Sequence, residues 1–184
     1  MEKKTLGLAL CGSYCSYDKL FAGAETLAAR FDLIPIMSDT AAETDSRFGT
    51  AVEHIQRLMA LCGGTPVVST IPEAEPLGPA RPMDALLIAP CTGNTLAKLA
   101  QGVTDSAVTM AAKAHLRNNK PVILAISTND GLSGSAENLA RLLNRKHVYF
   151  VPFGQDDPIQ KPNSLQADFS LLLDAVEDLP ALLP

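Results

Sequence analysis

The sequence predicts a single α/β domain of the Rossmann-like kind over residues 1–184, with a parallel sheet covered by helices on both faces. Short, almost wholly apolar segments alternate along the chain with longer segments that carry apolar residues at helical spacing. A strand with one solvent-exposed face alternates polar and apolar residues, and the short segments lack this alternation. Its absence is typical of strands that are buried on both faces. With 47% hydrophobic and 19% charged residues, the chain has enough aliphatic material for a continuous core.

Five apolar segments are expected to form the main strands, with a short additional strand at 65–69. The main strands are expected at 6–11, 33–37, 85–89, 121–126 and 148–151. The segment 33–37 contains Pro35, which has no backbone N–H to donate. We therefore expect this segment at an edge of the sheet or as an irregular strand.

Apolar residues spaced three and four apart predict helices between these strands. The predicted helices are 19–30, 50–61, 95–101, 107–117, 136–143 and 164–179. Gly63 and Gly64 follow the second of them and suit a helix C-terminus. Four prolines lie in the segment 71–82, so this segment is expected to be a loop.

Charge and targeting patterns argue against several classes of protein. The formal net charge is −5 and no cluster of Lys and Arg is present, so nucleic acid is not expected as a partner. The apolar run 5–11 is too short for a secretory signal or a membrane span, so a cytoplasmic location without membrane attachment is expected. The four cysteines form no Cys-x-x-Cys pair, so neither a metal site nor a disulfide framework is expected.

Polar, glycine-containing loops follow the predicted strands at the edge where parallel sheets bind ligands. These loops are 12–16, 38–40, 90–95, 127–131 and 152–157. Their hydroxyls and backbone N–H groups suit a phosphate, although capping and turn formation also explain each loop taken alone. The motif GxGxxG and the phosphate-binding motif GxxxxGK followed by Ser or Thr are absent, which disfavours a standard NAD or ATP site and leaves flavin mononucleotide (FMN) open.

Titratable side chains give few candidates for catalysis or substrate binding. The histidines are His54, His115 and His147. An isolated histidine is more often structural than catalytic. Lys113, His115 and Arg117 form either a cationic patch for a substrate carboxylate or an ordinary solvated face.

Two cysteines and an acidic pair also stand at predicted strand ends. Cys15 and Cys91 are either reactive thiols or small hydrophobic residues. Asp156 and Asp157 supply either an acid or base, or a turn.

The segment 90–95, Pro-Cys-Thr-Gly-Asn-Thr, resembles the Pro-x-x-x-Asn-Thr loop of the flavin-dependent cysteine decarboxylase superfamily, in which this loop surrounds the flavin. Within that superfamily the chain resembles in particular the branch of the dipicolinate synthase B subunits. The resemblance is carried by LCGSYCSYDK, APCTGNTLAKLAQGVTDSAVTMAAKAHLRNNKPV, AISTNDGLSGSAENLARLLN and YFVPFGQDDPIQKPNSL. These segments cover nearly the whole chain.

The resemblance implies a flavodoxin-like three-layer α/β/α sandwich with an FMN cofactor. The implied activity is that of an oxidoreductase, which forms pyridine-2,6-dicarboxylate (dipicolinic acid) from a dihydrodipicolinate-pathway precursor during endospore formation. The implied partners are the A subunit of dipicolinate synthase, which carries NAD(P), a small dicarboxylate substrate, and further copies of the chain in a homo-oligomer. The implied location is the cytoplasm of the mother cell of a sporulating bacterium.

The resemblance also assigns flavin contacts to four loops of this sequence. The implied flavin contacts are Gly12, Ser13, Ser38, Cys91, Thr92, Gly93, Asn94, Thr95, Ser127 and Thr128. A dicarboxylate substrate suits the cationic group of Lys113, His115 and Arg117, provided that these side chains face the site. The resemblance assigns no catalytic residue.

The chain also departs from the decarboxylases. Their catalytic histidine precedes the Pro-x-x-x-Asn-Thr loop, and the neighbourhood of Pro76 occupies that position here. Their Met-rich substrate clamp is replaced by Ser-Thr-Asn-Asp at 127–130. Two alternatives to the role in a two-component enzyme therefore stand: a non-catalytic scaffold that has kept the fold but lost the flavin, and a stand-alone FMN-dependent decarboxylase.

Overall fold

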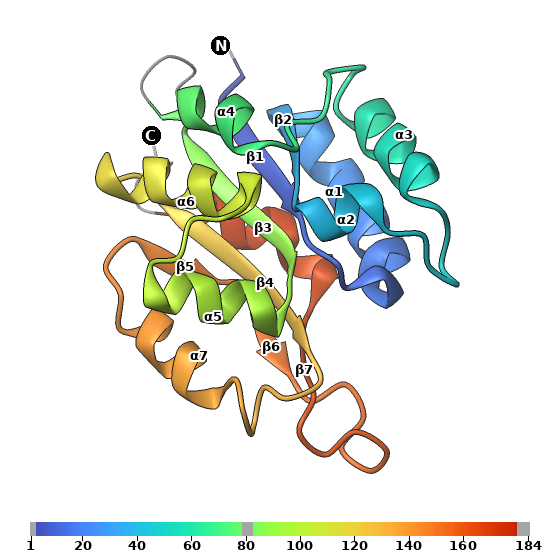
Figure 1. Cartoon of the computed structure of the whole chain (residues 1–184), viewed down its shortest axis with the longest axis vertical. Coiled ribbons are helices and arrows are strands. Elements are labelled where there is room, and N and C mark those ends of the chain that lie inside the picture. Colours follow the sequence, from blue (N-terminus) through green and yellow to red (C-terminus); the bar gives the residue numbers. More distant parts are fainter. Residues whose placement is uncertain (1–2, 79–82, 180–184) are drawn as a thin grey trace.

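The central strands of the sheet are buried runs of aliphatic residues, as the sequence predicts. β1 (Thr5–Leu10), β3 (Ala85–Cys91) and β4 (Val122–Thr128) lie side by side and parallel, and nearly all of their side chains are buried. The computed structural model describes residues 3–78 and 83–179. Figure 1 shows these strands running together through the middle of the molecule.

Further strands extend the sheet on both sides of this group. β2 (Asp32–Met37) pairs parallel with β1 and forms one edge, which confirms the prediction from its proline. β5 (Val148–Phe150) pairs parallel with the first half of β4. The antiparallel strands β7 (Leu165–Ala167) and β6 (Phe153–Gly154) continue the sheet from the second half of β4. Within the described residues the order is β2-β1-β3-β4-β7-β6, with β5 beside this path.

Helices cover both faces of the sheet and enclose two hydrophobic clusters. One face is covered by α1 (Tyr17–Arg30), α2 (Asp39–Glu43), α3 (Ala51–Leu61) and α8 (Leu172–Glu177). The other face is covered by α4 (Ile71–Ala74), α5 (Gly93–Gln101), α6 (Ala107–Arg117) and α7 (Ala136–Leu143). Figure 1 shows α5 and α6 in front of the strands. The predicted three-layer α/β/α sandwich is confirmed.

Hydroxyl side chains cap the helices α5 and α6 at their N-termini. Thr92 is the residue between β3 and α5, and its Oγ1 accepts a hydrogen bond from the Thr95 N–H at the start of α5. Ser106 and Thr109 form a capping box at the start of α6. The polar residues that a ligand could contact are therefore held by the helix starts themselves.

The segment 71–82 is predicted to be a loop, and this prediction is wrong for its first half. Residues Ile71–Ala74 form α4, and Glu75–Leu77 continue as a 3-10 turn. Pro72 lies in the first helical turn, where no backbone N–H is needed for the helix. Thr70 and Glu73 form a capping box that fixes this start. Residues 79–82 lie outside the described part of the chain.

The predicted helix 164–179 is also wrong in its first half. This segment forms β7, then the 3-10 turn Phe169–Leu171, then α8. Buried Leu165 and Ala167 alternate with the half-buried Gln166, which is the period of a strand. Asp168 then accepts a hydrogen bond from the Ser170 N–H and turns the chain into the helix.

The expected strand 65–69 is reduced to one bridge, between Val68 and Ile36. Across residues 3–78 and 83–179, the helices are all too short or too polar to span a bilayer.

Candidate functional site

Two adjoining pockets lie at the carboxyl ends of the parallel strands. The serine pocket, of about 350 Å³, is lined by Ser13, Ser127, Thr128, Lys161 and Gln166, among others. The cap pocket, of about 270 Å³, is lined by Ser38, Asn94, Thr95, Lys98 and Ser106, among others. Gly12 and Thr92 line both pockets and form the wall that they share.

The structure brings most of the expected flavin contacts to these two pockets. Gly12, Ser13, Thr92, Gly93, Ser127 and Thr128 line the serine pocket. Gly12, Ser38, Thr92, Asn94 and Thr95 line the cap pocket. The expected residues therefore gather at the carboxyl ends of the parallel strands, in two adjoining pockets rather than in one cavity.

Cys91 is the exception among them. Its side chain is fully buried within β3 and packs in the hydrophobic cluster beneath α5 and α6, so it lines neither pocket. Burial raises the pKa of the Cys91 thiol well above its ordinary value. Burial likewise raises the pKa of Cys11 to about 11. These two cysteines behave as small hydrophobic residues, whereas Cys15 is exposed and lines the serine pocket.

Three serine hydroxyls meet at the wall of the serine pocket. Ser127 Oγ lies 2.8 Å from Ser13 Oγ and 2.7 Å from Ser16 Oγ. Gln166 Nε2 donates to Ser16 Oγ at 3.2 Å, from the strand opposite β4. Ser16 and Ser127 are buried, and Ser13 is half-buried at the pocket surface. The hydroxyl cluster thus extends from the protein interior to the ligand space.

A second polar cluster lies where α5 begins. Thr128 and Ser135 both donate to Oδ1 of Asp130, at 2.5 and 2.8 Å. These hydrogen bonds favour the ionised carboxylate and lower the pKa of Asp130. The cluster packs against Gly93, where an added Cβ would lie 2.6 Å from Thr128 Oγ1. Glycine at this position lets the start of α5 approach the Thr128 loop closely.

The cap pocket is suited to an anion. The N-termini of α5 and α6 both border it, through Asn94 and Ser106. Backbone N–H groups at helix N-termini carry a partial positive charge and attract anionic ligands. Lys98 adds a cation, which is paired with Asp105 at 2.9 Å, and Asp39 adds one carboxylate to the same lining. A phosphate is therefore a suitable ligand here.

An ion pair lies beside the serine pocket on the segment that joins β6 and β7. Lys161 Nζ lies 3.1 Å from Asp156 Oδ2, and both residues line the pocket. The Ser164 hydroxyl and Lys161 lower the pKa of Asp156, and Asp156 raises the pKa of Lys161. Both groups are thus held in their charged forms near neutral pH.

Sequence reasoning missed Lys161, Ser164 and Gln166 as pocket residues. The available signal is the alternation in β7, where polar Gln166 stands between two apolar residues. The apolar residues of 164–179 also fit the spacing of one helix, and the prediction of that helix excluded the strand.

The structure does not bring Lys113, His115 and Arg117 to either pocket. They lie in the second half of α6, whose first residues border the cap pocket. His115 is buried near Asp84 and Lys120, which precede the amino ends of β3 and β4. Burial, the largest cause, and Lys120 lower the pKa of His115 to about 4. A neutral imidazole at the opposite edge of the sheet does not support the expected substrate contact.

The other histidines also line neither pocket, although His54 packs behind Tyr14, which lines the serine pocket. His54 is buried against Tyr14 and Tyr17, with ring centroids 5.9 and 4.6 Å apart, and burial lowers its pKa. His147 lies before β5 and lines neither pocket. Within residues 3–78 and 83–179, no three His, Cys, Asp or Glu side chains are grouped to hold a metal ion.

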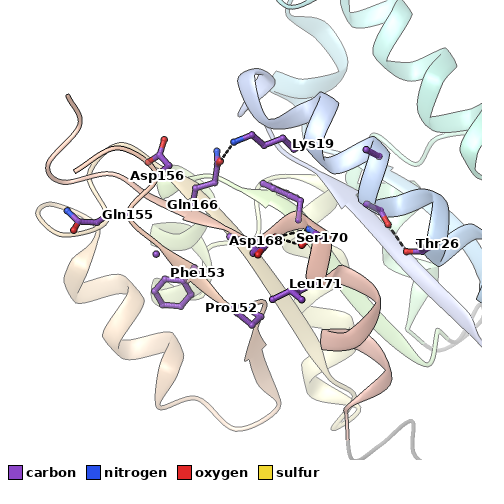
Figure 2. Close-up of a pocket in the computed structure, with 15 residues that line it drawn as sticks. Lys19, Thr26, Pro152, Phe153, Gln155, Asp156, Gln166, Asp168, Ser170 and Leu171 are labelled. Carbon is purple, nitrogen blue, oxygen red and sulfur yellow. Dashed lines mark hydrogen bonds between the residues drawn. The ribbon is translucent and has the colours of Figure 1, made fainter. Parts of the chain in front are cut away.

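A larger surface groove of about 930 Å³ lies next to the serine pocket. It runs between α1, the β6–β7 pair and the turn Phe169–Leu171 (Figure 2). Gln166 and Asp156 line both the surface groove and the serine pocket. Figure 2 shows Lys19 of α1 reaching across to Gln166, and the hydrogen bond between them measures 2.7 Å.

Comparisons with known proteins agree on one group of relatives. The family model described as Flavoprotein matches residues 1–166. The dipicolinate synthase B subunit of Bacillus subtilis (strain 168) is 44% identical over 178 residues, which are 96% of this chain and 88% of that protein. The crystal structure of the dipicolinate synthase B subunit from Bacillus halodurans is 42% identical and has a TM-score of 0.86, covering 97% of this chain and 91% of that one.

A more distant solved structure shares the fold. The FMN-dependent cysteine decarboxylase SpaF is 21% identical and has a TM-score of 0.68, covering 94% of this chain and 95% of that one.

Proposed function

Because the chain belongs to the flavoprotein family, in the branch of the dipicolinate synthase B subunits, we propose that it acts as the B subunit of a dipicolinate synthase. In this role it contributes to the oxidation of a dihydrodipicolinate-pathway precursor to pyridine-2,6-dicarboxylate during endospore formation. The observation that carries the proposal is the 44% identity with a named B subunit over 96% of the chain.

The proposal includes FMN on this chain, and the residues of the two pockets fit it. The cap pocket has Ser38, Asn94 and two helix N-termini, which suit a phosphate. The serine pocket has hydroxyls beside the aromatic side chains of Tyr14 and Phe48, which suit the polar edge and the face of a flat ring. A bound flavin supplies a two-electron acceptor for the oxidation.

The substrate is proposed to enter the serine pocket. Lys161 provides the cation among the described residues that line this pocket, and the Ser164 and Ser127 hydroxyls line the same pocket. A carboxylate of the substrate would bind there by charge-assisted hydrogen bonds. In this arrangement Lys161 orients the ring, and the substrate carboxylate competes with Asp156 for Lys161.

The proposal extends to the partner, the assembly and the location of the chain. We propose an A subunit that carries NAD(P), a homo-oligomer of this chain, and the cytoplasm of the mother cell. Two exposed apolar side chains support further contacts near the site: Phe48, 47% exposed, lines the serine pocket, and Ile159, 86% exposed, lies between Asp156 and Lys161.

The test mixes this chain and its A-type partner with dihydrodipicolinate, NAD(P) and FMN. Formation of the ultraviolet-absorbing pyridine product that requires both proteins supports the proposal. No pyridine product from the mixed, folded proteins would overturn it. The absorbance spectrum of the purified chain, alone and with added FMN, tests the cofactor separately.

A second candidate is a scaffold protein that has lost its flavin. It is favoured by one observation: among the described residues, the histidines line neither pocket. A flavin absorbance band that stays with the chain through gel filtration would exclude the scaffold. Product formation without any flavin, but still dependent on this chain, would favour it.

A further inference from the structure

A continuous series of hydrogen bonds joins the surface groove to the serine pocket. Lys19 Nζ donates to Oε1 of Gln166 at 2.7 Å, and Gln166 Nε2 donates to Ser16 Oγ at 3.2 Å. Ser16 Oγ lies 2.7 Å from Ser127 Oγ, which lies 2.8 Å from Ser13 Oγ. Figure 2 shows the first link at the rim of the groove, between α1 and β7.

The chemistry of the end groups gives this series a direction. A lysine ammonium can only donate, so the amide oxygen of Gln166 faces Lys19 and the amide nitrogen faces Ser16. The amide nitrogen also only donates, so Ser16 accepts there and directs its own proton to its nearest hydroxyl, Ser127. Ser127 then donates to Ser13. The proton of Ser13 has two longer contacts within the protein, with Ser16 Oγ at 3.3 Å and Cys15 Sγ at 3.8 Å, and a ligand oxygen in the pocket at ordinary hydrogen-bond distance is the better acceptor.

Burial helps to preserve this order. Ser16 is 0% exposed and Ser127 is 7% exposed, so water has little access to compete for their protons. Hydrogen bonds are stronger in such surroundings, and each polarises the next. The backbone supports the same arrangement, because Ser127 of β4 pairs directly with Gln166 of β7.

We propose that Gln166, held by Lys19, is a positioning residue that makes Ser13 a hydrogen-bond donor into the serine pocket. A donor at this point favours an acceptor oxygen, above all the anionic oxygen of a phosphate or a carboxylate, over an N–H group. The inference rests on the proposed function, since it gives a polarity to the pocket that holds cofactor or substrate.

The test measures three dissociation constants for the full-length chain. The probes are FMN, riboflavin, which lacks the phosphate, and pyridine-2,6-dicarboxylate. In Gln166→Glu the side chain keeps its shape but accepts from both Lys19 and Ser16, so the series reverses and Ser13 no longer donates to the ligand. We expect the Kd of an anionic probe to rise about tenfold and that of riboflavin to change by less than about twofold.

The two anionic probes distinguish the source of the anion. A rise for FMN alone assigns the Ser13 contact to the phosphate, and a rise for the dicarboxylate alone assigns it to the substrate. Either result supports the inference.

Matched variants separate direction from charge. Gln155→Glu adds the same charge within the surface groove but lies outside the series, and it is expected to leave the anion affinities within about twofold. Lys19→Met removes the fixed end of the series and is expected to weaken anion binding about threefold, whereas Lys19→Arg keeps a donor and rescues it. Lys146→Met removes an exposed cation elsewhere and controls for net charge.

Several outcomes overturn the inference. Unchanged anion affinities in a folded Gln166→Glu variant reject it and leave the proposed function intact, as does an equal loss in Gln155→Glu. If Gln166→Glu loses as much affinity for riboflavin as for FMN, the inference is also rejected. If the wild-type chain binds none of the three probes, both the inference and the proposed function are rejected. If Gln166→Glu fails to fold, the comparison of Lys19→Met with Lys19→Arg decides.

Discussion

The hydroxyl of Thr128 donates to Oδ1 of Asp130 at 2.5 Å, so its proton is committed away from the serine pocket that Thr128 lines. Thr128 therefore presents acceptor lone pairs to the pocket, whereas we infer that Ser13 presents a proton. The two hydroxyls differ in polarity because each is fixed by a partner behind it. A ligand with both an anionic oxygen and a ring N–H would satisfy this pair.

Replacing Asp130 by Asn should destabilise the fold by about 1 kcal/mol at neutral pH, because a neutral amide is a weaker acceptor for two hydroxyls. The lowered pKa of Asp130 means that its stabilisation is present above the ordinary Asp range and is lost as pH falls through the lowered pKa. The free energies of unfolding of the wild type and Asp130→Asn, measured with urea, should therefore become equal at acid pH. Glu25→Gln, on the exposed face of α1, is the control, and a constant difference at all pH values would contradict the prediction.

Gly93→Ala should cost about 1–3 kcal/mol of stability, because the added Cβ would lie 2.6 Å from Thr128 Oγ1 and 2.8 Å from Ser135 Oγ. FMN affinity should fall as well, since the start of α5 must move. The matched control is Gly154→Ala, whose Cβ meets nothing within 4 Å. Thermal unfolding and flavin titration of both variants check this, and equal stability would refute it.

Lys161→Met should raise the Kd of pyridine-2,6-dicarboxylate about tenfold by removing the pocket's cation. Asp156→Asn should lower this Kd, because it removes the carboxylate that competes for Lys161 at 3.1 Å. Isothermal titration of the two variants measures both changes. Parallel losses would show that the pair acts only by holding the loop.

His115 should make the protein less stable as the solution is acidified. Its pKa is lowered from 6.5 to about 4, so the unfolded chain binds a proton first and the free energy of unfolding falls by roughly 1.4 kcal/mol per pH unit within that interval. Above pH 6.5 this contribution is fully present. Urea unfolding of His115→Gln should lack this component, and a variant with the wild-type slope would contradict the assignment.

Much of the fold could be predicted because buried elements have a characteristic spacing of apolar residues in the sequence. The strand at 85–89 is apolar on both faces, and the helices at 107–117 and 136–143 have the predicted bounds. The pocket edge was also predictable, because polar loops must follow buried parallel strands. The hydrogen-bond partners of Ser13 could not be predicted, because they depend on residues from distant segments.

The errors arise where two periodicities compete. Leu165, Phe169 and Leu172 fit a helical series, yet Leu165 and Ala167 pack as strand residues once β7 can pair with β4. Strand pairing therefore decided this case. The position of Lys113 and Arg117 depends instead on the direction of α6, which begins at the cap pocket and runs away from it.

The pairing of Ser16 with Gln166 joins residues that are 150 positions apart in the chain. β7 follows β1, β3 and β4 in the chain, so the wall of the serine pocket is complete only once this later segment has paired with β4. A variant that loses the β4–β7 pairing should therefore keep its parallel strands and lose its ligand.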